Sequence, residues 1–268
     1  MSLSISGKTA IVTGAANGIG LAIARHFIDK GANVMFADMD ETRLESEIGE
    51  EARTEGPIRM FAGDLRQKLA ITNLLSATMD AFERVDILVN ASRQITLSDP
   101  LCIEEDAVEA MLQQNMLTSL RLSQLTAKRM IAQAERDGIQ GAAGTIINLS
   151  SIAATRTRPE LLGYSIACAA LDQMTRAMAV ALAPKGIRVN AVSIGSVMSA
   201  SLQAQLKETP EFRDTIIAAT PMGRIASPAE LVETVQYLAS DASSFLTGQI
   251  ITLDGGRSIL DAVAAPAH

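Results

Sequence analysis

The segment TAIVTGAANGIG (residues 9–20) decides the fold. Its first five residues, TAIVT (9–13), form an apolar run that predicts a buried strand, and the amphipathic pattern over Ile19–Lys30 predicts a helix directly after the glycines. A strand, a glycine loop and a helix in this order are typical of a phosphate cradle, because glycine lets the backbone approach closely and the helix start offers free N–H groups. The GxxxGxG spacing also fits an ordinary tight turn, since it differs from the common GxGxxG dinucleotide fingerprint.

Six further apolar runs alternate with amphipathic stretches along the chain, and each run predicts a buried strand. These runs are NVMFAD (33–38), IRMFAGD (58–64), DILVN (86–90), TIINLS (145–150), IRVNAVSI (187–194) and QIITLD (249–254). The helical patterns between them are Asp40–Glu55, Leu65–Phe82, Asn115–Arg136, Tyr164–Ala183 and Pro228–Ala239. A repeated strand and helix order implies right-handed crossovers. We therefore expect an α/β fold, a Rossmann-type doubly wound sheet of seven parallel strands flanked by helices.

Length and composition favour a single domain. The chain has 268 residues, of which 48% are hydrophobic and 20% charged, and no Pro, Gly or Ser-rich linker divides it. We predict one dinucleotide-binding domain over residues 1–268. Within it, the strand pattern stops over residues 196–221, which we interpret as a substrate lid, and residues 257–268 form a C-terminal tail.

Charge and cysteine content exclude several classes of function. The formal charge is −7 and no Lys or Arg cluster stands out, so we expect no nucleic acid and no membrane as partner. Cys102 and Cys168 are too few and too far apart for a disulfide framework or a zinc site, and we expect no metal. Residues 1–8 have no signal-peptide pattern. We therefore expect a cytoplasmic location.

The acid at the end of the second predicted strand indicates which dinucleotide is bound. Asp38 lies 18 residues after Gly20, close to the spacing of the acid that binds the adenosine ribose in dinucleotide folds. A carboxylate there also repels a 2′-phosphate, so NAD is favoured and NADP is less suited. The alternative is that Asp38 caps the next helix, but Asp40 could also fill that role.

With these motifs in place, the chain resembles the short-chain dehydrogenase/reductase family. Thr13, Gly14, Gly18 and Gly20 match the family's TGxxxGxG motif, and later motifs follow in order over essentially the whole chain: Asp64-Leu65, DILVN (86–90), RVNAVSIG (188–195) and TGQIITLDGG (247–256). The resemblance implies a nicotinamide cofactor, a small-molecule alcohol or carbonyl substrate, and a homodimer or homotetramer. It assigns cofactor binding to Gly14, Asn17, Gly18, Ile19, Gly20, Asp38, Asp64, Leu65, Asn90, Ala91, Tyr164, Gly195, Val197 and Ser199.

The resemblance also implies a catalytic group of serine, tyrosine, lysine and asparagine. Ser151 precedes Tyr164 by 13 residues, as in the family, and Asn115 matches the asparagine. The lysine position, four residues after Tyr164, holds Cys168. A tyrosine with a pKa near 10 is only about 0.1% ionised at pH 7, and a neutral thiol cannot acidify it. The lost cation has three candidate replacements: Arg93, Arg156 and Arg158.

Arg93 marks a second departure from the family pattern. The family's Asn-Asn-Ala-Gly reads Asn90-Ala91-Ser92-Arg93 here, so an arginine stands where a glycine usually lies along the cofactor. One interpretation is that the side chain points to solvent. The other is that it puts a cation near the nicotinamide or the substrate.

Two functions therefore remain open. The first is an NAD-dependent oxidoreductase that interconverts an alcohol and a carbonyl compound with reduced activity. The second is a catalytically impaired dinucleotide-binding module or a structural subunit of an oligomer. The presence of Ser151, Tyr164 and Asn115 favours the enzyme. We expect oligomer contacts through the helices that begin near Asn115 and Tyr164. The apolar stripe on the latter, which either joins copies or packs in the core, consists of Leu171, Met174, Met178 and Leu182.

Overall fold

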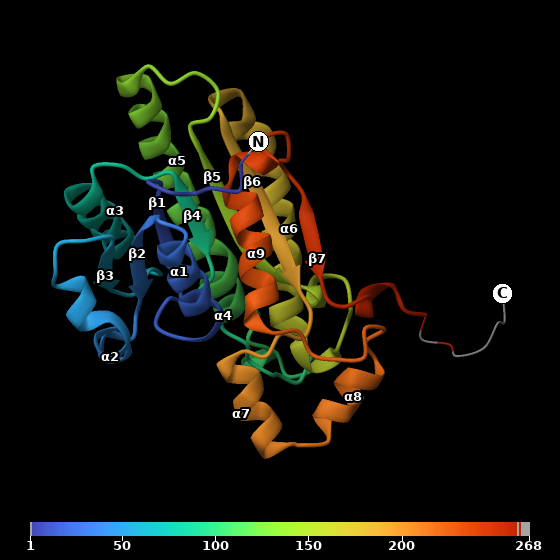
Figure 1. The fold of residues 1–268 in the computed structure, drawn as a ribbon. Coiled ribbons are helices and arrows are strands. Elements are labelled where there is room, and N and C mark those ends of the chain that lie inside the picture. Colours follow the sequence, from blue (N-terminus) through green and yellow to red (C-terminus); the bar gives the residue numbers. More distant parts are fainter. Residues whose placement is uncertain (1, 262, 264–268) are drawn as a thin grey trace.

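A seven-stranded parallel sheet forms the centre of the structure, a computed structural model that describes residues 2–261 and 263 (Figure 1). The strand order is β3-β2-β1-β4-β5-β6-β7. The order reverses between β1 and β4, and such a switch point opens a crevice at the carboxyl ends of the strands. The predicted doubly wound fold is thereby confirmed. The strands are β1 (Thr9–Thr13), β2 (Asn33–Asp38), β3 (Ile58–Ala62), β4 (Ile87–Asn90), β5 (Gly144–Ser151), β6 (Ile187–Ile194) and β7 (Ile250–Leu253).

Helices cover both faces of the sheet because each strand sends alternate side chains to opposite sides. On β1, Val12 packs into a core with α1, α2 and α9, whereas Ile11 packs into a second core with α3, α5 and α6. Both cores are apolar, as the continuous hydrophobic runs predict. These helices are α1 (Gly18–Asp29), α2 (Glu41–Ala52), α3 (Lys68–Phe82), α5 (Thr118–Asp137), α6 (Leu162–Leu182) and α9 (Pro228–Ala239).

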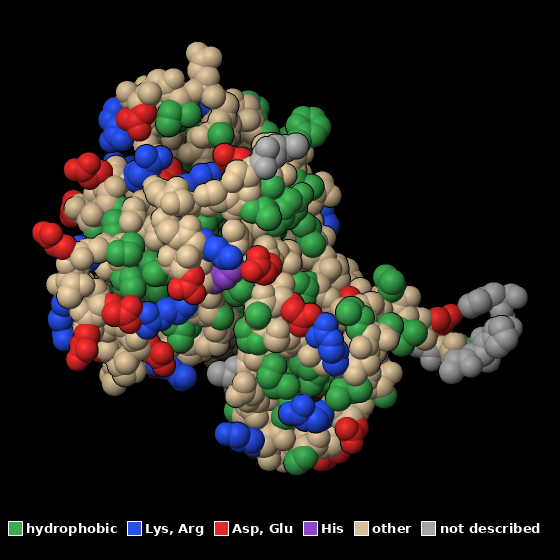
Figure 2. Space-filling model, in the orientation of Figure 1, with side chains coloured by type: hydrophobic (Ala, Val, Ile, Leu, Met, Phe, Trp, Pro, Cys, Tyr) green, Lys and Arg blue, Asp and Glu red, His purple; other side chains and the backbone are tan. Residues whose placement is uncertain are grey.

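The predicted lid, residues 196–221, contains two helices that the sequence did not predict. These are α7 (Ala200–Glu208) and α8 (Phe212–Ala218), which project beyond the carboxyl ends of the strands (Figure 1). Figure 2 shows charged and hydrophobic side chains side by side on this projection. Of the predicted tail at 257–268, residue 262 and residues 264–268 lie outside the described residues.

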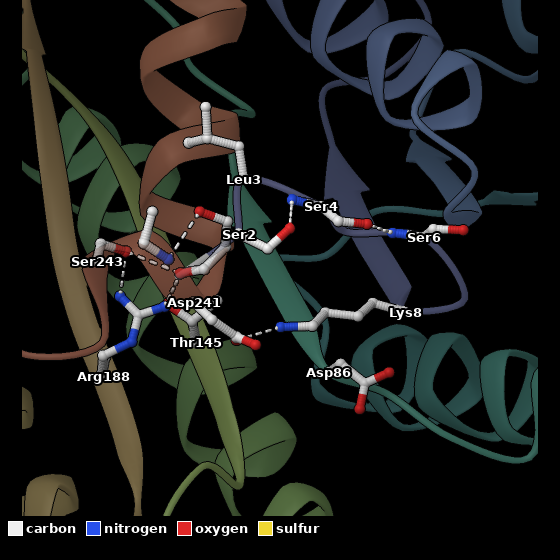
Figure 3. Close-up of polar contacts among 12 residues, drawn as sticks. Ser2, Leu3, Ser4, Ser6, Lys8, Asp86, Thr145, Arg188, Asp241 and Ser243 are labelled. Carbon is white, nitrogen blue, oxygen red and sulfur yellow. Dashed lines mark hydrogen bonds and ion pairs between the residues drawn. The ribbon is translucent and has the colours of Figure 1, made fainter.

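Polar contacts join distant segments at the amino end of the sheet (Figure 3). Lys8 Nζ lies 2.8 Å from Asp241 Oδ1. Arg188, at the start of β6, donates to Ser243 Oγ at 2.8 Å and to the carbonyl of Leu238 at 2.9 Å. A cavity of about 770 Å³ opens here, and none of the predicted site residues lines it. This end of the sheet lies opposite the glycine loop, which follows the carboxyl end of β1.

The predicted apolar stripe on α6 belongs largely to the interior. Leu171 and Met174 are buried, and Met178 and Leu182 are partly buried against the second core. By length and composition the stretch Pro159–Lys185 is apolar enough to cross a membrane, but core helices of soluble proteins meet the same criterion. Because Leu171 and Met174 are buried, we attribute the apolar composition of α6 to its packing in the core.

Candidate active site

The glycine loop leads from β1 into α1 and packs against the loop after β4. Gly14 has a φ of +68°, and a Cβ there would lie 2.8 Å from the Cα of Ser92. A Cβ on Gly20 would collide with the Gly14 carbonyl. Thr13 Oγ1 accepts hydrogen bonds from the backbone N–H groups of Ala91 and Ser92, both at 3.0 Å. Only glycine therefore fits these positions, and the loop after β4 is tied to the loop after β1.

Asp38 lies at the rim of a hollow beside the glycine loop. Its Oδ2 accepts from Ala16 N at 3.0 Å, and its Oδ1 accepts from Asp40 N at 3.1 Å. The cap of α2 is Asp40, whose Oδ1 accepts from Arg43 N at 3.0 Å. The helix-cap alternative therefore belongs to Asp40. The predicted adenosine residues converge on this hollow, which is lined by Gly14, Asp38, Gly63, Asp64 and Leu65 among others.

The remaining predicted cofactor residues fall into two groups. Asn90 is buried, and its amide donates to Ser123 Oγ at 3.0 Å and to Asn148 Oδ1 at 2.8 Å, so its side chain belongs to an interior network. The others line the loops at the carboxyl end of the sheet. Ser199 caps α7 by accepting from Leu202 N at 3.2 Å. The others are Asn17, Gly18 and Ile19 at the start of α1, Gly195 packed against Asp254, and buried Val197.

Tyr164 is buried in a small apolar cluster between α6 and α4 (Val108–Leu112). Gly163 allows this packing, because a Cβ there would meet the Ala107 carbonyl at 3.0 Å. Tyr164 is 2% exposed, and no described group makes a hydrogen bond of good geometry to its hydroxyl. Ser151, at the end of β5, accepts from Ala153 N at 3.2 Å. The predicted serine and tyrosine are thus brought to one place, which is closed to solvent.

Burial dominates the electrostatics of this cluster. It raises the pKa of Tyr164 to about 12 and the pKa of Cys168 to about 11. The guanidinium of Arg93 lowers both pKa values, and Ser151 also lowers that of Tyr164. Both acids are therefore neutral at physiological pH in this structure.

Arg93 takes the inward of its two predicted orientations. Its Cζ lies 5.7 Å from the centroid of the Tyr164 ring, and its Nη1 donates to the Ser150 carbonyl at 3.3 Å. The other candidate cations, Arg156 and Arg158, are exposed. Among the three arginines, Arg93 is the one in contact with Tyr164.

Asn115 sits in a π-helical turn (Gln113–Leu117) and holds the segment that carries Arg93. Its Oδ1 accepts from Gln94 N, and its Nδ2 donates to the Gln94 carbonyl, both at 2.9 Å. The predicted asparagine is thus near the site, and its amide acts on the loop after β4.

Two features of the site escaped sequence reasoning. One is α4, whose five residues are too few to show a helical period. The other is Asp172, which is 6% exposed and whose pKa is raised by burial. The signal for Asp172 was available, because Tyr164, Cys168 and Asp172 recur every four residues and so share one helix face. Among the described residues, no group of three or more His, Cys, Asp or Glu is placed to hold a metal ion.

The chain is similar to known oxidoreductases over nearly its whole length. Residues 14–258 match the family described as enoyl-(acyl carrier protein) reductase. A galactitol 2-dehydrogenase (L-tagatose-forming) of Cereibacter sphaeroides is 32% identical over 257 residues, covering 95% of this chain and 96% of that protein. Two solved structures share the fold and more than a quarter of the sequence. A gluconate 5-dehydrogenase from Burkholderia cenocepacia in complex with NADP and tartrate has a TM-score of 0.86 at 26% identity, covering 97% of this chain and 98% of that one. A 7α-hydroxysteroid dehydrogenase complexed with NADH and 7-oxo-glycochenodeoxycholic acid has a TM-score of 0.84 at 28% identity, covering 95% of each chain.

Proposed function

Because the chain belongs to the short-chain dehydrogenase/reductase family of oxidoreductases, we propose that it interconverts an alcohol and a carbonyl compound with NAD as its cofactor, in the cytoplasm. The observation that carries the proposal is that the Ser151 hydroxyl lies beside Tyr164 at the carboxyl end of the sheet, where the glycine loop also lies. The bound nicotinamide would supply or accept the hydride. We propose one domain, with residues 196–221 as its lid.

The residues around the glycine loop fit the adenosine half of a dinucleotide. Asp38 presents carboxylate oxygens at the rim of the hollow, and Gly14 gives backbone access where a Cβ would fill the space. Two features favour NAD over NADP. The residue after Asp38 is the uncharged Met39, and Arg66 is held by Asp64 through two hydrogen bonds of 2.8 and 2.9 Å. A 2′-phosphate would thus meet the Asp38 carboxylate without a free cation beside it.

In this mechanism Ser151 orients the substrate oxygen and Tyr164 exchanges a proton with it. Asn115 keeps the loop after β4 in place. Cys168 stands where the family has a lysine, and because its thiol is neutral it supplies no positive charge to Tyr164. Substrate must displace part of the packing over Tyr164, because the hydroxyl is closed to solvent.

The buried hydroxyl also favours the second function, a dinucleotide-binding module with impaired catalysis. A tyrosine whose pKa is about 12 is a weak proton acceptor at neutral pH. In this case the chain would bind NADH and serve in an oligomer without turning over an alcohol.

The experiment is a titration with NADH and NADPH, followed by their own fluorescence, and a panel of sugar alcohols, hydroxy acids and hydroxysteroids with their carbonyl partners. We expect NADH to bind more tightly than NADPH, and Asp38→Ser to lose at least tenfold of that preference. An unchanged preference removes Asp38 from the site. Tight NADH binding with no turnover of any compound supports the binding module, and absence of binding to both nucleotides contradicts the proposal.

We also propose that the chain forms a homodimer or homotetramer through the outer faces of α5 and α6. A groove of about 650 Å³ runs between α3, α5 and α6, and its apolar lining includes Leu125, Ile131 and Met178. A groove of this kind is suited to burial against a second copy.

A further inference from the structure

The buried face of α6 carries no cation next to Tyr164. One turn along the helix is Cys168, a neutral thiol, and one turn further is Asp172, a buried carboxyl. Both raise the pKa of the group before them on the helix: Cys168 that of Tyr164, and Asp172 that of Cys168. The helix therefore opposes ionisation of Tyr164, and a stabilising charge has to come from another element.

We propose that Arg93, on the loop after β4, supplies the positive charge that stabilises the Tyr164 phenolate. This inference deepens the proposed function and rests on it. The guanidinium carbon lies 5.7 Å from the Tyr164 ring centroid, within the range of a cation–π contact. Its Nη1 donates to the Ser150 carbonyl at 3.3 Å, next to Ser151. The guanidinium thus contacts the Tyr164 ring and the backbone next to Ser151.

The backbone on both sides of Arg93 is fixed. On one side, Ser92 N donates to Thr13 Oγ1 at 3.0 Å. On the other, Asn115 makes two hydrogen bonds of 2.9 Å to the backbone of Gln94. These hydrogen bonds fix the backbone from which the Arg93 side chain extends, so its charge stays near Tyr164. In this chain the asparagine of the site is therefore a positioning residue for the cation.

Arg93 is the charged group that lowers the pKa of Tyr164, and the Ser151 hydroxyl acts in the same direction. The groups that face the ring are Ser151 from β5, Met111 from α4, Ala153 from the turn after β5, and Cys168 from α6. Of these, only Cys168 is titratable, and it is neutral. Burial still outweighs Arg93 in the closed structure, where the pKa of Tyr164 is about 12. When substrate and water enter, part of the burial is relieved and the attraction of Arg93 remains.

In the proposed reaction Arg93 keeps its charge and neither gains nor loses a proton. In the direction of reduction, Tyr164 would give its proton to the carbonyl oxygen, and a bound reduced nicotinamide would supply the hydride to the carbonyl carbon. The O–H bond of Tyr164 breaks, and its electron pair remains on the phenolate beside Arg93. A proton from solvent then restores the hydroxyl. At a separation of about 6 Å and an effective dielectric constant of about 20, a unit charge changes an ionisation constant by roughly a hundredfold.

The chain offers a direct test that needs no turnover, because it contains two tyrosines and no tryptophan. In a Tyr237→Phe background, absorbance at 295 nm reports the ionisation of Tyr164 alone, with circular dichroism to define the pH range in which the fold persists. We expect Arg93→Met to raise the pKa of Tyr164, so that it no longer ionises before the fold is lost. Arg93→Lys should leave the titration close to that of the parent. The matched control is Arg156→Met, which removes an exposed arginine. A titration unchanged by Arg93→Met overturns the proposal.

A second measurement covers the case in which alkaline unfolding precedes ionisation in every variant. It uses kcat and its pH profile, in the parent and in the Cys168→Lys background. If Arg93 stabilises the phenolate, Arg93→Met should lower kcat on the order of a hundredfold and move the profile to higher pH, with NADH affinity within a few-fold. In the Cys168→Lys background the same change should cost less than tenfold, because a second cation is then present. Equal losses in both backgrounds, or a gain in kcat on removal of Arg93, overturn the proposal; a gain would mean that the guanidinium obstructs the site.

The failure of the proposed function would look different. If no variant binds NADH while the tyrosine titration still responds to Arg93, the coupling of Arg93 to Tyr164 stands and the oxidoreductase assignment does not.

Discussion

Cys168 lies one turn from Tyr164 on the buried face of α6, and burial keeps both side chains neutral. The folded pKa of Cys168 is about 11, against a reference value of 9.0, and that of Tyr164 is about 12, against 10.0. Between pH 9 and pH 12 the unfolded chain releases protons that the folded chain retains. The free energy of unfolding therefore falls as pH rises through this window, and each group contributes about 3 kcal/mol to the fall.

We predict that Cys168→Ala flattens this dependence. Between pH 8 and pH 11 the variant should lose about 2 kcal/mol less of its unfolding free energy than the parent, because its share of the retained protons is gone. Urea unfolding at several pH values, followed by circular dichroism, measures the slope. Cys102→Ala removes the other thiol, which is half-buried outside the site, and should keep the parent slope. Parallel slopes for Cys168→Ala and the parent would show that the Cys168 thiol is not shielded in solution.

Residue types at the site were predictable from the sequence, but their orientations were not. The glycines were recognised because they follow the end of β1, and Asp38 because it ends β2 at the expected spacing from them. Arg93 left two orientations open, because its partner Tyr164 lies 71 residues away in the sequence and only the packed structure brings them together. Asn90 illustrates the same limit. Its position after β4 indicates the cofactor, whereas its amide binds Ser123 and Asn148, which no local pattern reveals.

At the scale of elements, strand positions were the most predictable feature. A strand buried on both faces needs a continuous apolar run, so β1, β2 and β6 have the predicted bounds. The short α4 could not be found in this way. It follows Ala107, whose φ of +56° is unusual for a residue with a side chain, and tertiary packing holds it against α6. The helices α7 and α8 were missed because polar and small residues blur the helical period in the lid.

Packing of α4 against α6 buries Tyr164, and Gly163 lets the two helices approach closely because it has no side chain. We predict that Gly163→Val destabilises the protein by about 1–3 kcal/mol, because the new side chain must displace the Ala107 backbone 3.0 Å from its Cβ. The same change should expose Tyr164. Thermal unfolding measures the first effect, and acrylamide quenching of tyrosine fluorescence in a Tyr237→Phe background measures the second.

The control for this prediction is Gly56→Val. A Cβ on Gly56 meets nothing within 4 Å, so the substitution adds the same side chain to open space. If Gly163→Val has the same melting temperature as this control, and if Tyr164 is no more accessible to acrylamide, α4 does not cover the site in solution.

The outer face of α6 carries exposed apolar side chains at both ends and small residues between them. Val180 is 79% exposed and Ile166 is 40% exposed, and the exposed residues between them are Ala169, Gln173, Arg176 and Ala177. Small residues allow close approach of a second helix, and a two-fold axis through this face would set α6 against its own copy. The face lies on the outside of the helix whose inner face holds Tyr164, so assembly would stiffen the element that carries the site.

We therefore predict a species of two or four copies of the 28.3 kDa chain in sedimentation at micromolar concentration. Ala177→Arg should shift it toward the monomer without loss of fold, since a buried guanidinium at such an interface has no partner on the symmetry-related copy and is repelled by its own counterpart. Ser46→Arg adds the same side chain to the exposed surface of α2 and should leave the assembly intact. Because the site lies within one chain, the monomeric variant should still bind NADH, with the affinity lowered only as far as α6 becomes more mobile. A parent that sediments as a monomer, or an assembly that Ala177→Arg does not disturb, would mean that the outer face of α6 is not where copies of the chain meet.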